Sequence, residues 1–168
     1  MALPRKLKNF NLLLDGESYA GQATEIVLPK LSRNLEEFRA GGMSGPVSAD
    51  MGMQAMSMEF TVGHDVRVYR QFGTARADGA LIRFVGAYQR EDSAEVSAVE
   101  VVARGRYSEI DPGTAQAGQD APVKVTAALS YYKLTVDGVV EVEIDLMNFV
   151  EVVGGVDRLA EQRNALGL

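Results

Sequence analysis

SYYKLTVDGVVEVEIDL, residues 130–146, carries alternating apolar and polar residues on both sides of an Asp-Gly pair. A period of two places apolar side chains on one face of a β-strand and polar side chains on the other. Asp137-Gly138 favours the tight two-residue turn that joins antiparallel strands. With the preceding residues included, the predicted apolar face consists of Val123, Val125, Ala127, Leu129, Tyr131, Val140, Val142, Ile144 and Leu146. The stretch therefore predicts an antiparallel hairpin.

Similar signals recur along the rest of the chain. Asp15-Gly16 predicts a smaller hairpin between FNLLL and ESYAGQATEIVL, and Asp78-Gly79 precedes a strand over 80–88 with apolar residues on both faces. Further strands are expected over 35–40, 57–63 and 94–107. The last of these changes its alternation near Ala98-Val99, which indicates a bulge or a bend.

Two short helices complete the predicted elements. The first covers 64–73, with Gly73 as its stop. The second covers 155–167, with Asp157 as the N-cap and Gly167 as the terminator. The residues expected at helical spacing are Val66, Tyr69 and Phe72 in the first, and Leu159, Arg163 and Leu166 in the second. The prediction is a mainly β fold, an antiparallel β-sandwich or barrel with one or two α-helices, in a single domain over residues 1–168.

Composition excludes several classes of protein. No run approaches the ~20 apolar residues of a membrane-spanning helix, and Leu12–Leu14 is too short for a signal-peptide core, so synthesis in the cytosol is expected. The chain has no cysteine, which rules out disulfides and cysteine-zinc sites. A formal charge of −6 disfavours general nucleic-acid binding, because phosphate contacts need clustered Lys and Arg.

A second stretch, RAGGMSGPVSADMGMQAMSMEF (residues 39–60), holds five of the seven methionines. Its glycines and proline disfavour regular structure in its first half, and Asp50 is the only charge between Ala40 and Met58. A loop normally lies on the surface and is polar. An apolar loop therefore favours contact with another copy of the chain over packing inside the monomer. The expected contact residues are Gly41, Gly42, Met43, Pro46, Met51 and Met53, while Met56 and Met58 suit a core-filling role at the start of the next strand.

Glu141, Glu143 and Asp145 form an acidic row at alternate positions of one predicted strand, so all three are expected on one face. A solvated outer face is the favoured interpretation. A paired-carboxylate active site would need a cleft and unequal environments to separate the two pKa values. A third interpretation is an acidic surface repeated around a ring of subunits.

Signals for catalysis or metal binding are few. His64 is the only histidine, and beside Asp65 at a predicted helix start it suits a capping or surface role. GGMSGP (41–46) lacks the Lys-Ser/Thr pair of a phosphate-binding loop, and no stretch has the oxygen ligands of a calcium loop. The sequence therefore predicts a protein that is not an enzyme and that uses no cofactor and no metal.

Four blocks of sequence carry a resemblance to a known family. They are NFNLLLDGESYAG (9–21), LPKLSRNLEEFRAGGMSGPVSADMGMQAM (28–56), ALSYYKLTVDGVVEVEIDLMN (128–148) and GVDRLAEQRNALGL (155–168). In order and spacing they resemble the major tail tube proteins of contractile-tailed bacteriophages, a family that includes the tubes of R-type phage-tail-like bacteriocins. The resemblance spans most of the chain, although residues 74–120 carry no diagnostic motif.

This resemblance implies hexameric rings that stack into the hollow inner tube of a contractile tail, with an inner wall that is a continuous β-barrel. Residues 41–56 match a long loop that reaches the adjoining ring, and 155–167 match a C-terminal helix. Implied partners are other copies of the chain, a tail sheath protein, a tape-measure protein, a tail initiator or baseplate, and a terminator. DNA would be non-specific passing cargo, the chain itself would bind no membrane, and the protein would reside in the virion tail.

A negative inner wall would let DNA pass without binding it. Glu141, Glu143 and Asp145 are accordingly hypothesised to face either the lumen or the sheath. One alternative within the family is a bacteriocin tube that carries no DNA. A remoter alternative is a small β-barrel that binds an apolar ligand beneath the methionine-rich loop as a lid.

Overall fold

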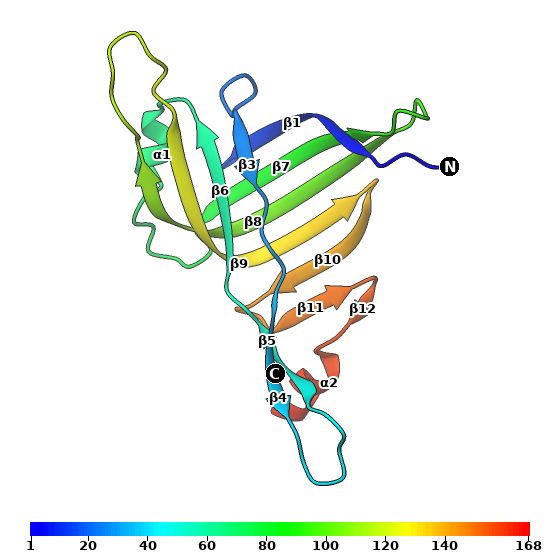
Figure 1. Cartoon of the computed structure of the whole chain (residues 1–168). Coiled ribbons are helices and arrows are strands. Elements are labelled where there is room, and N and C mark those ends of the chain that lie inside the picture. Colours follow the sequence, from blue (N-terminus) through cyan, green and yellow to red (C-terminus); the bar gives the residue numbers. More distant parts are fainter.

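A curved antiparallel sheet of ten strands dominates the computed structural model, which describes residues 1–168 (Figure 1). Its main path has the order β12-β11-β10-β9-β8-β7-β1-β2, while β6 pairs with β9 and carries β3 on its other side. A separate two-stranded sheet, β4-β5, projects away from it. The strands are β1 (Lys6–Leu14), β2 (Glu17–Ser18), β3 (Glu25–Val27), β4 (Arg33–Phe38), β5 (Val47–Met53), β6 (Met56–Val62), β7 (Ala80–Gln89), β8 (Val96–Asp111), β9 (Val123–Val136), β10 (Val139–Asp145), β11 (Val150–Val153) and β12 (Val156–Asp157), and the helices are α1 (Val66–Arg70) and α2 (Ala160–Leu166).

The hairpin expected around Asp137-Gly138 is present as β9-β10. Asp137 and Gly138 have φ angles of 49° and 81°, the positive pair that this type of turn requires. Asp15 and Gly16 form an equivalent turn between β1 and β2, with φ angles of 51° and 83°. The mainly antiparallel β architecture is therefore confirmed.

Strand β9 changes partners along its length, and this change curls the sheet. Its first half pairs with β6, with Leu129 opposite Met56, and its second half pairs with β10, with Tyr131 opposite Asp145. Strand β8 pairs with β9 along the other edge of both halves. Strands β6 and β3 consequently form a second layer over one face of the sheet (Figure 1). Twenty buried hydrophobic residues fill the space between the layers.

A bulge at Ser130 reverses the alternation of β9. Arg104 lies opposite Tyr131 and Gly105 lies opposite Leu129, so Ser130 has no partner on β8. Leu129 and Tyr132 therefore both face the core, and Tyr131 lies on the opposite face. The expectation that Tyr131 shares the apolar face is wrong for this reason.

The bulge predicted near Ala98-Val99 is also misplaced. Strand β8 keeps its register with β7 from Val96 to Gly105, and its irregularities lie further along, opposite β9. The residues that face the core are the odd-numbered ones from Ser97 to Tyr107. Val96 and Val102 are apolar residues on the face opposite the core, and they interrupt the alternation in the sequence although the strand has no irregularity there.

Both helices are shorter than predicted. In α1 the buried residue is Val68, whereas Val66 and Phe72 are 54% and 56% exposed. Helix α2 begins after Leu159 and buries no residue, and Leu166 is 64% exposed. Asp157 lies in β12 and accepts hydrogen bonds from the Leu159 amide and from Arg163, while Gly167 is the left-handed C-cap as expected. Neither helix is long and apolar enough to cross a membrane.

The close approach of β8 and β9 gives a stability prediction. A Cβ atom at Gly105 would overlap the carbonyl oxygen of Ala128, which belongs to the backbone and cannot move freely. We expect Gly105→Ala to lower the free energy of unfolding by about 2 kcal/mol or more. Gly45→Ala is the matched control, because no heavy atom lies within 4 Å of its added Cβ. Urea unfolding of dilute protein measures both, and an unchanged midpoint for Gly105→Ala would contradict the packing described.

Candidate functional site

The methionine-rich stretch forms a β-hairpin arm, defined here as residues 33–53, and the predicted loop over 41–56 is wrong for most of its length. Strand β5 pairs with β4 from Phe38 opposite Val47 to Arg33 opposite Met53. Only residues 39–46 form an irregular tip, which contains Gly41, Gly42, Met43 and Pro46. The sequence of β5 does alternate, with Val47, Ala49, Met51 and Met53 between polar residues or glycine, but the glycines and Pro46 just before it favour a loop.

The arm exposes apolar side chains that a monomer leaves in water. Leu35, Phe38, Val47 and Met51 are each more than half exposed. Met53, at the root of the arm, is half-buried against the core. Met56 and Met58 are 2% and 1% exposed within β6, so the core-filling role expected for them is confirmed. The methionines of the stretch thus divide between arm and core.

The arm points away from the core (Figure 1). The space between the two layers of the sheet is already filled by hydrophobic side chains. The root of the arm lines one side of a partly open pocket of about 720 Å³, whose other walls come from β10, β11 and the segment around α2. Arg33, Asp50 and Glu151 place charged groups in this pocket, which suits a purely apolar ligand poorly.

The face of the main sheet opposite the core is open and polar. Register places Arg83, Val102, Lys133 and Glu143 in one row across it. Rows on either side add Glu100, which pairs with Arg83 at 2.8 Å, and Arg104, Tyr131 and Asp145. We call this surface the open face. It carries Glu143 and Asp145 together as predicted, whereas Glu141 lies at a register irregularity of β10.

Two members of the acidic row, Glu143 and Asp145, form hydrogen bonds that stabilise the local structure. The Tyr131 hydroxyl donates to Glu143 at 3.0 Å, and burial together with this carboxylate raises the pKa of Tyr131 to about 12. Asp145 accepts hydrogen bonds from the backbone amides of Met147 and Asn148 and from the Asn148 side chain. It therefore closes the turn after β10 and is not paired with a second carboxylate.

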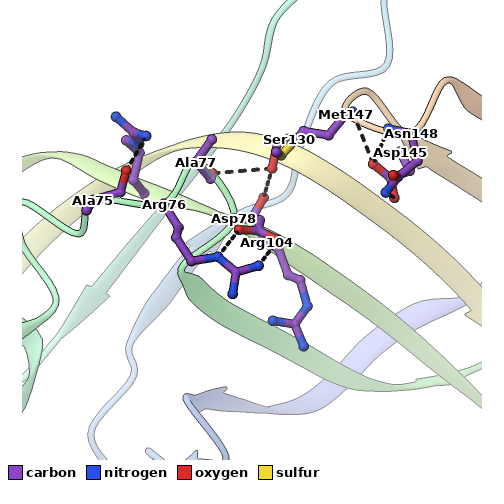
Figure 2. A network of polar contacts seen from close by, with 10 residues as sticks. Ala75, Arg76, Ala77, Asp78, Arg104, Ser130, Asp145, Met147 and Asn148 are labelled. Carbon is purple, nitrogen blue, oxygen red and sulfur yellow. Dashed lines mark hydrogen bonds and ion pairs between the residues drawn. The ribbon is translucent and has the colours of Figure 1, made fainter.

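The bulge in β9 supports a polar network beside this turn (Figure 2). Ser130 donates to the carbonyl oxygens of Ala77 and Arg104, and Arg106 donates to the carbonyl of Ala75. Arg76 forms two hydrogen bonds of 3.0 Å with Asp78. These contacts hold the segment between α1 and β7 against the sheet, which gives residues 74–79 a structural role that sequence motifs did not reveal.

The main path of the sheet, from β12 to β2, ends in two unpaired edges, and β3 forms a further short edge beside β6. Strand β1 pairs with β7 on one side, but on its other side only Leu13 and Leu14 meet β2, so the outer edge of Lys6–Asn11 is free. At the opposite end, β12 pairs with β11 on one side only. Free edges expose backbone N–H and C=O groups that can pair with another chain.

No group of three or more His, Cys, Asp or Glu residues is arranged to hold a metal ion. His64 stacks near Tyr69, and its neighbour Asp65 caps α1 through the Arg67 amide. The exposed features described above are the arm, the open face and the edges of the main sheet. They are suited to contacts between macromolecules.

Comparison with known proteins decides the class. The family model described as phage tail tube protein FII matches residues 4–167. The chain belongs to this family. It is 45% identical to the tail tube protein of Escherichia phage P2 over the full length of both chains, and 38% identical to the major tail tube protein of Serratia phage KSP20, covering 89% of this chain and 88% of that one.

Solved structures show the same fold at low sequence identity. A chain of the PVC extracellular contractile injection system sheath-tube complex aligns with a TM-score of 0.59 at 10% identity, covering 79% of this chain and 91% of that chain. A chain of the anti-feeding prophage tube-terminating cap aligns with a TM-score of 0.59 at 15% identity, covering 80% and 93%. As a member of the tail tube family, the chain is a structural component of a phage tail and not an enzyme.

The division of methionines between arm and core gives a second prediction. Met58→Ala should lower the free energy of unfolding by about 3 kcal/mol, because it leaves a cavity in the core. Met51→Ala, the control on the arm, should change it by less than about 0.5 kcal/mol. Denaturant unfolding of dilute protein compares them. Equal losses for the two variants would mean that the arm packs into the fold.

Proposed function

We propose that copies of this chain close into hexameric rings, and that the rings stack into a hollow tube along which DNA passes. The observation that carries the proposal is an open polar face lying between two free edges of one sheet. Pairing of the β1 edge of one copy with the β10–β12 end of the next would remove both edges. The second layer of β3 and β6 lies on the core side, so ring closure would turn the open face toward the axis.

The arm supplies the contact between rings in this proposal. It leaves the body between β3 and β6 and exposes apolar side chains along its length. A contact between an arm and a different surface on the next copy is heterologous, and it therefore propagates into a filament. The residues proposed for this contact are Gly41, Gly42, Met43, Pro46 and Met51 of the arm, with Met53 acting at its root.

Further partners follow from the relatives. The similar chains belong to a sheath-tube complex, to a tube-terminating cap and to a baseplate, which supports a sheath, a terminator and a baseplate as partners here. A tape-measure protein would set the length of the tube. The relatives with the higher identity are phage tail proteins, which favours a DNA-carrying tail over a DNA-free bacteriocin tube.

Assembly itself is the first test. Negative-stain electron microscopy of purified protein at rising concentration should show six-fold rings and hollow tubes. Met51→Asp should abolish stacking, because a carboxylate would be buried in an apolar contact, while leaving the circular dichroism spectrum unchanged. Met51→Leu is the matched control and should still form tubes. If Met51→Asp formed tubes of normal length, the proposed role of the arm in the contact between rings would be wrong.

The orientation of the open face can be tested by labelling, since the chain has no cysteine. Assembled tubes of Glu143→Cys and of the control Ser57→Cys, an exposed residue on the outer side of β6, would be treated with biotin-maleimide and then with streptavidin. We expect streptavidin along the whole length of Ser57→Cys tubes but only at the ends of Glu143→Cys tubes. Streptavidin along Glu143→Cys tubes would assign the open face to the outside, where a sheath would meet it.

A further inference from the structure

The arm is joined to the rest of the molecule by one polar contact. Strands β4 and β5 pair only with each other and form their own sheet. Among the hydrogen bonds and ion pairs of residues 33–53, the contact between Arg33 and Glu151 of β11 is the one that reaches the body. The other contribution at the root is apolar packing of Met53 against the core.

The geometry of Arg33 ties three strands together. Its Nε and Nη2 atoms bind Asp50 of β5, with Nε 2.9 and 3.1 Å from the two carboxylate oxygens and Nη2 at 2.7 Å. Its Nη1 atom binds Oε1 of Glu151. The guanidinium also holds the pKa of Asp50 below its usual range. One planar group on β4 therefore fixes β5 and β11 at the same time, which the point charge of a lysine cannot do.

Glu151 is buried, so its carboxylate needs a partner in a defined position. It is 8% exposed and lies on the core side of the sheet, opposite Ile144. A buried carboxylate is costly without a partner, and Arg33 is its ion-pair partner. Satisfying Glu151 therefore favours the direction of the arm in which Arg33 reaches it.

We infer that Arg33 is the positioning residue of the arm, which it fixes in direction before a copy meets its neighbour. The inference rests on the proposed function, in which the arm contacts the next ring. A two-stranded hairpin is marginally stable alone in water, so an unanchored arm would fray and sample many directions. Ordering it during assembly would cost conformational entropy. Arg33 removes that cost in advance.

Hydrogen exchange on the monomer tests the inference directly. Arg33→Met removes the link, Glu151→Gln removes the negative charge that makes it an ion pair, and Arg33→Lys keeps the positive charge but loses the two-pronged geometry of the guanidinium. Arg76→Met is the matched control, because Arg76 forms a similar two-bond pair with Asp78 away from the arm. At a concentration where light scattering shows monomers, we expect arm amides (34–38 and 47–52) to exchange at least about tenfold faster in the three variants, with the amides of β7 to β9 unchanged.

Assembly provides the second measurement. The concentration needed for tube formation should rise at least about tenfold for Arg33→Met, Arg33→Lys and Glu151→Gln, and should stay unchanged for Arg76→Met. Protection of the arm equal to wild type in all three variants would overturn the inference, even if tubes form. Faster exchange throughout the body would also overturn it, because Arg33 would then support the whole fold. Failure of the wild type to form tubes would contradict the proposed function and would leave the exchange result to decide the anchoring of the arm.

Discussion

Strand β9 forms hydrogen-bonded ladders with three other strands, β6, β8 and β10. The rest of the structure depends on which part of β9 pairs with which of these strands. Along one edge, the first half of β9 pairs with β6 and the second half pairs with β10. Along the opposite edge, β9 pairs with β8. Ser130 is the extra residue at the point of division, and just before it the backbone of Ala128 and Leu129 approaches Gly105 of β8 closely. As a result, β6 passes over one face of the sheet, and β10 to β12 extend the sheet beyond that cover. The molecule acquires one covered face and one open face from this single irregularity.

As a consequence, the residues that stabilise the monomer differ from those that are exposed for contacts with other copies. The covered face holds a complete core, to which the tip of the arm and α2 contribute no buried residue. The apolar residues of the arm therefore cost the monomer little in folding and remain available for contacts with other chains. An arm without a core of its own needs another means of holding its direction, and Arg33 with buried Glu151 supplies one. For the same reason, the helical spacing of apolar residues at α1 and α2 does not indicate burial: Phe72, just after α1, and Leu166 of α2 are exposed.

The features that the sequence predicted are those set by local chemistry. Asp137-Gly138 specifies its turn through backbone conformation alone, and the alternation beside it specifies two strands. The bulge at Ser130 has no local sequence signal, because it is a property of the pairing between β9 and the neighbouring strand β8. The sequence predicts a loop where β5 forms, because the glycines and Pro46 before the strand outweigh its alternation of Val47, Ala49, Met51 and Met53. Glu143 and Asp145 were correctly given a common face, but their partners Tyr131 and Asn148 depend on the bulge and on the turn. No local pattern connects Arg33 with Glu151.

The open face changes the electrostatic interpretation of the tube. The net charge of −6 suggested an acidic wall, yet register brings together basic Arg83, Arg104 and Lys133 with acidic Glu100, Glu143 and Asp145. Arg83 is paired with Glu100, so its charge is locally balanced. Binding to DNA requires a track of cations along which phosphates can displace counterions. Basic groups that alternate with carboxylates form no such track, so a wall made of this face would release DNA without strong repulsion. The weak binding of DNA to this wall would come from the mixture of positive and negative side chains. The excess negative charge of the chain would lie on its other surfaces.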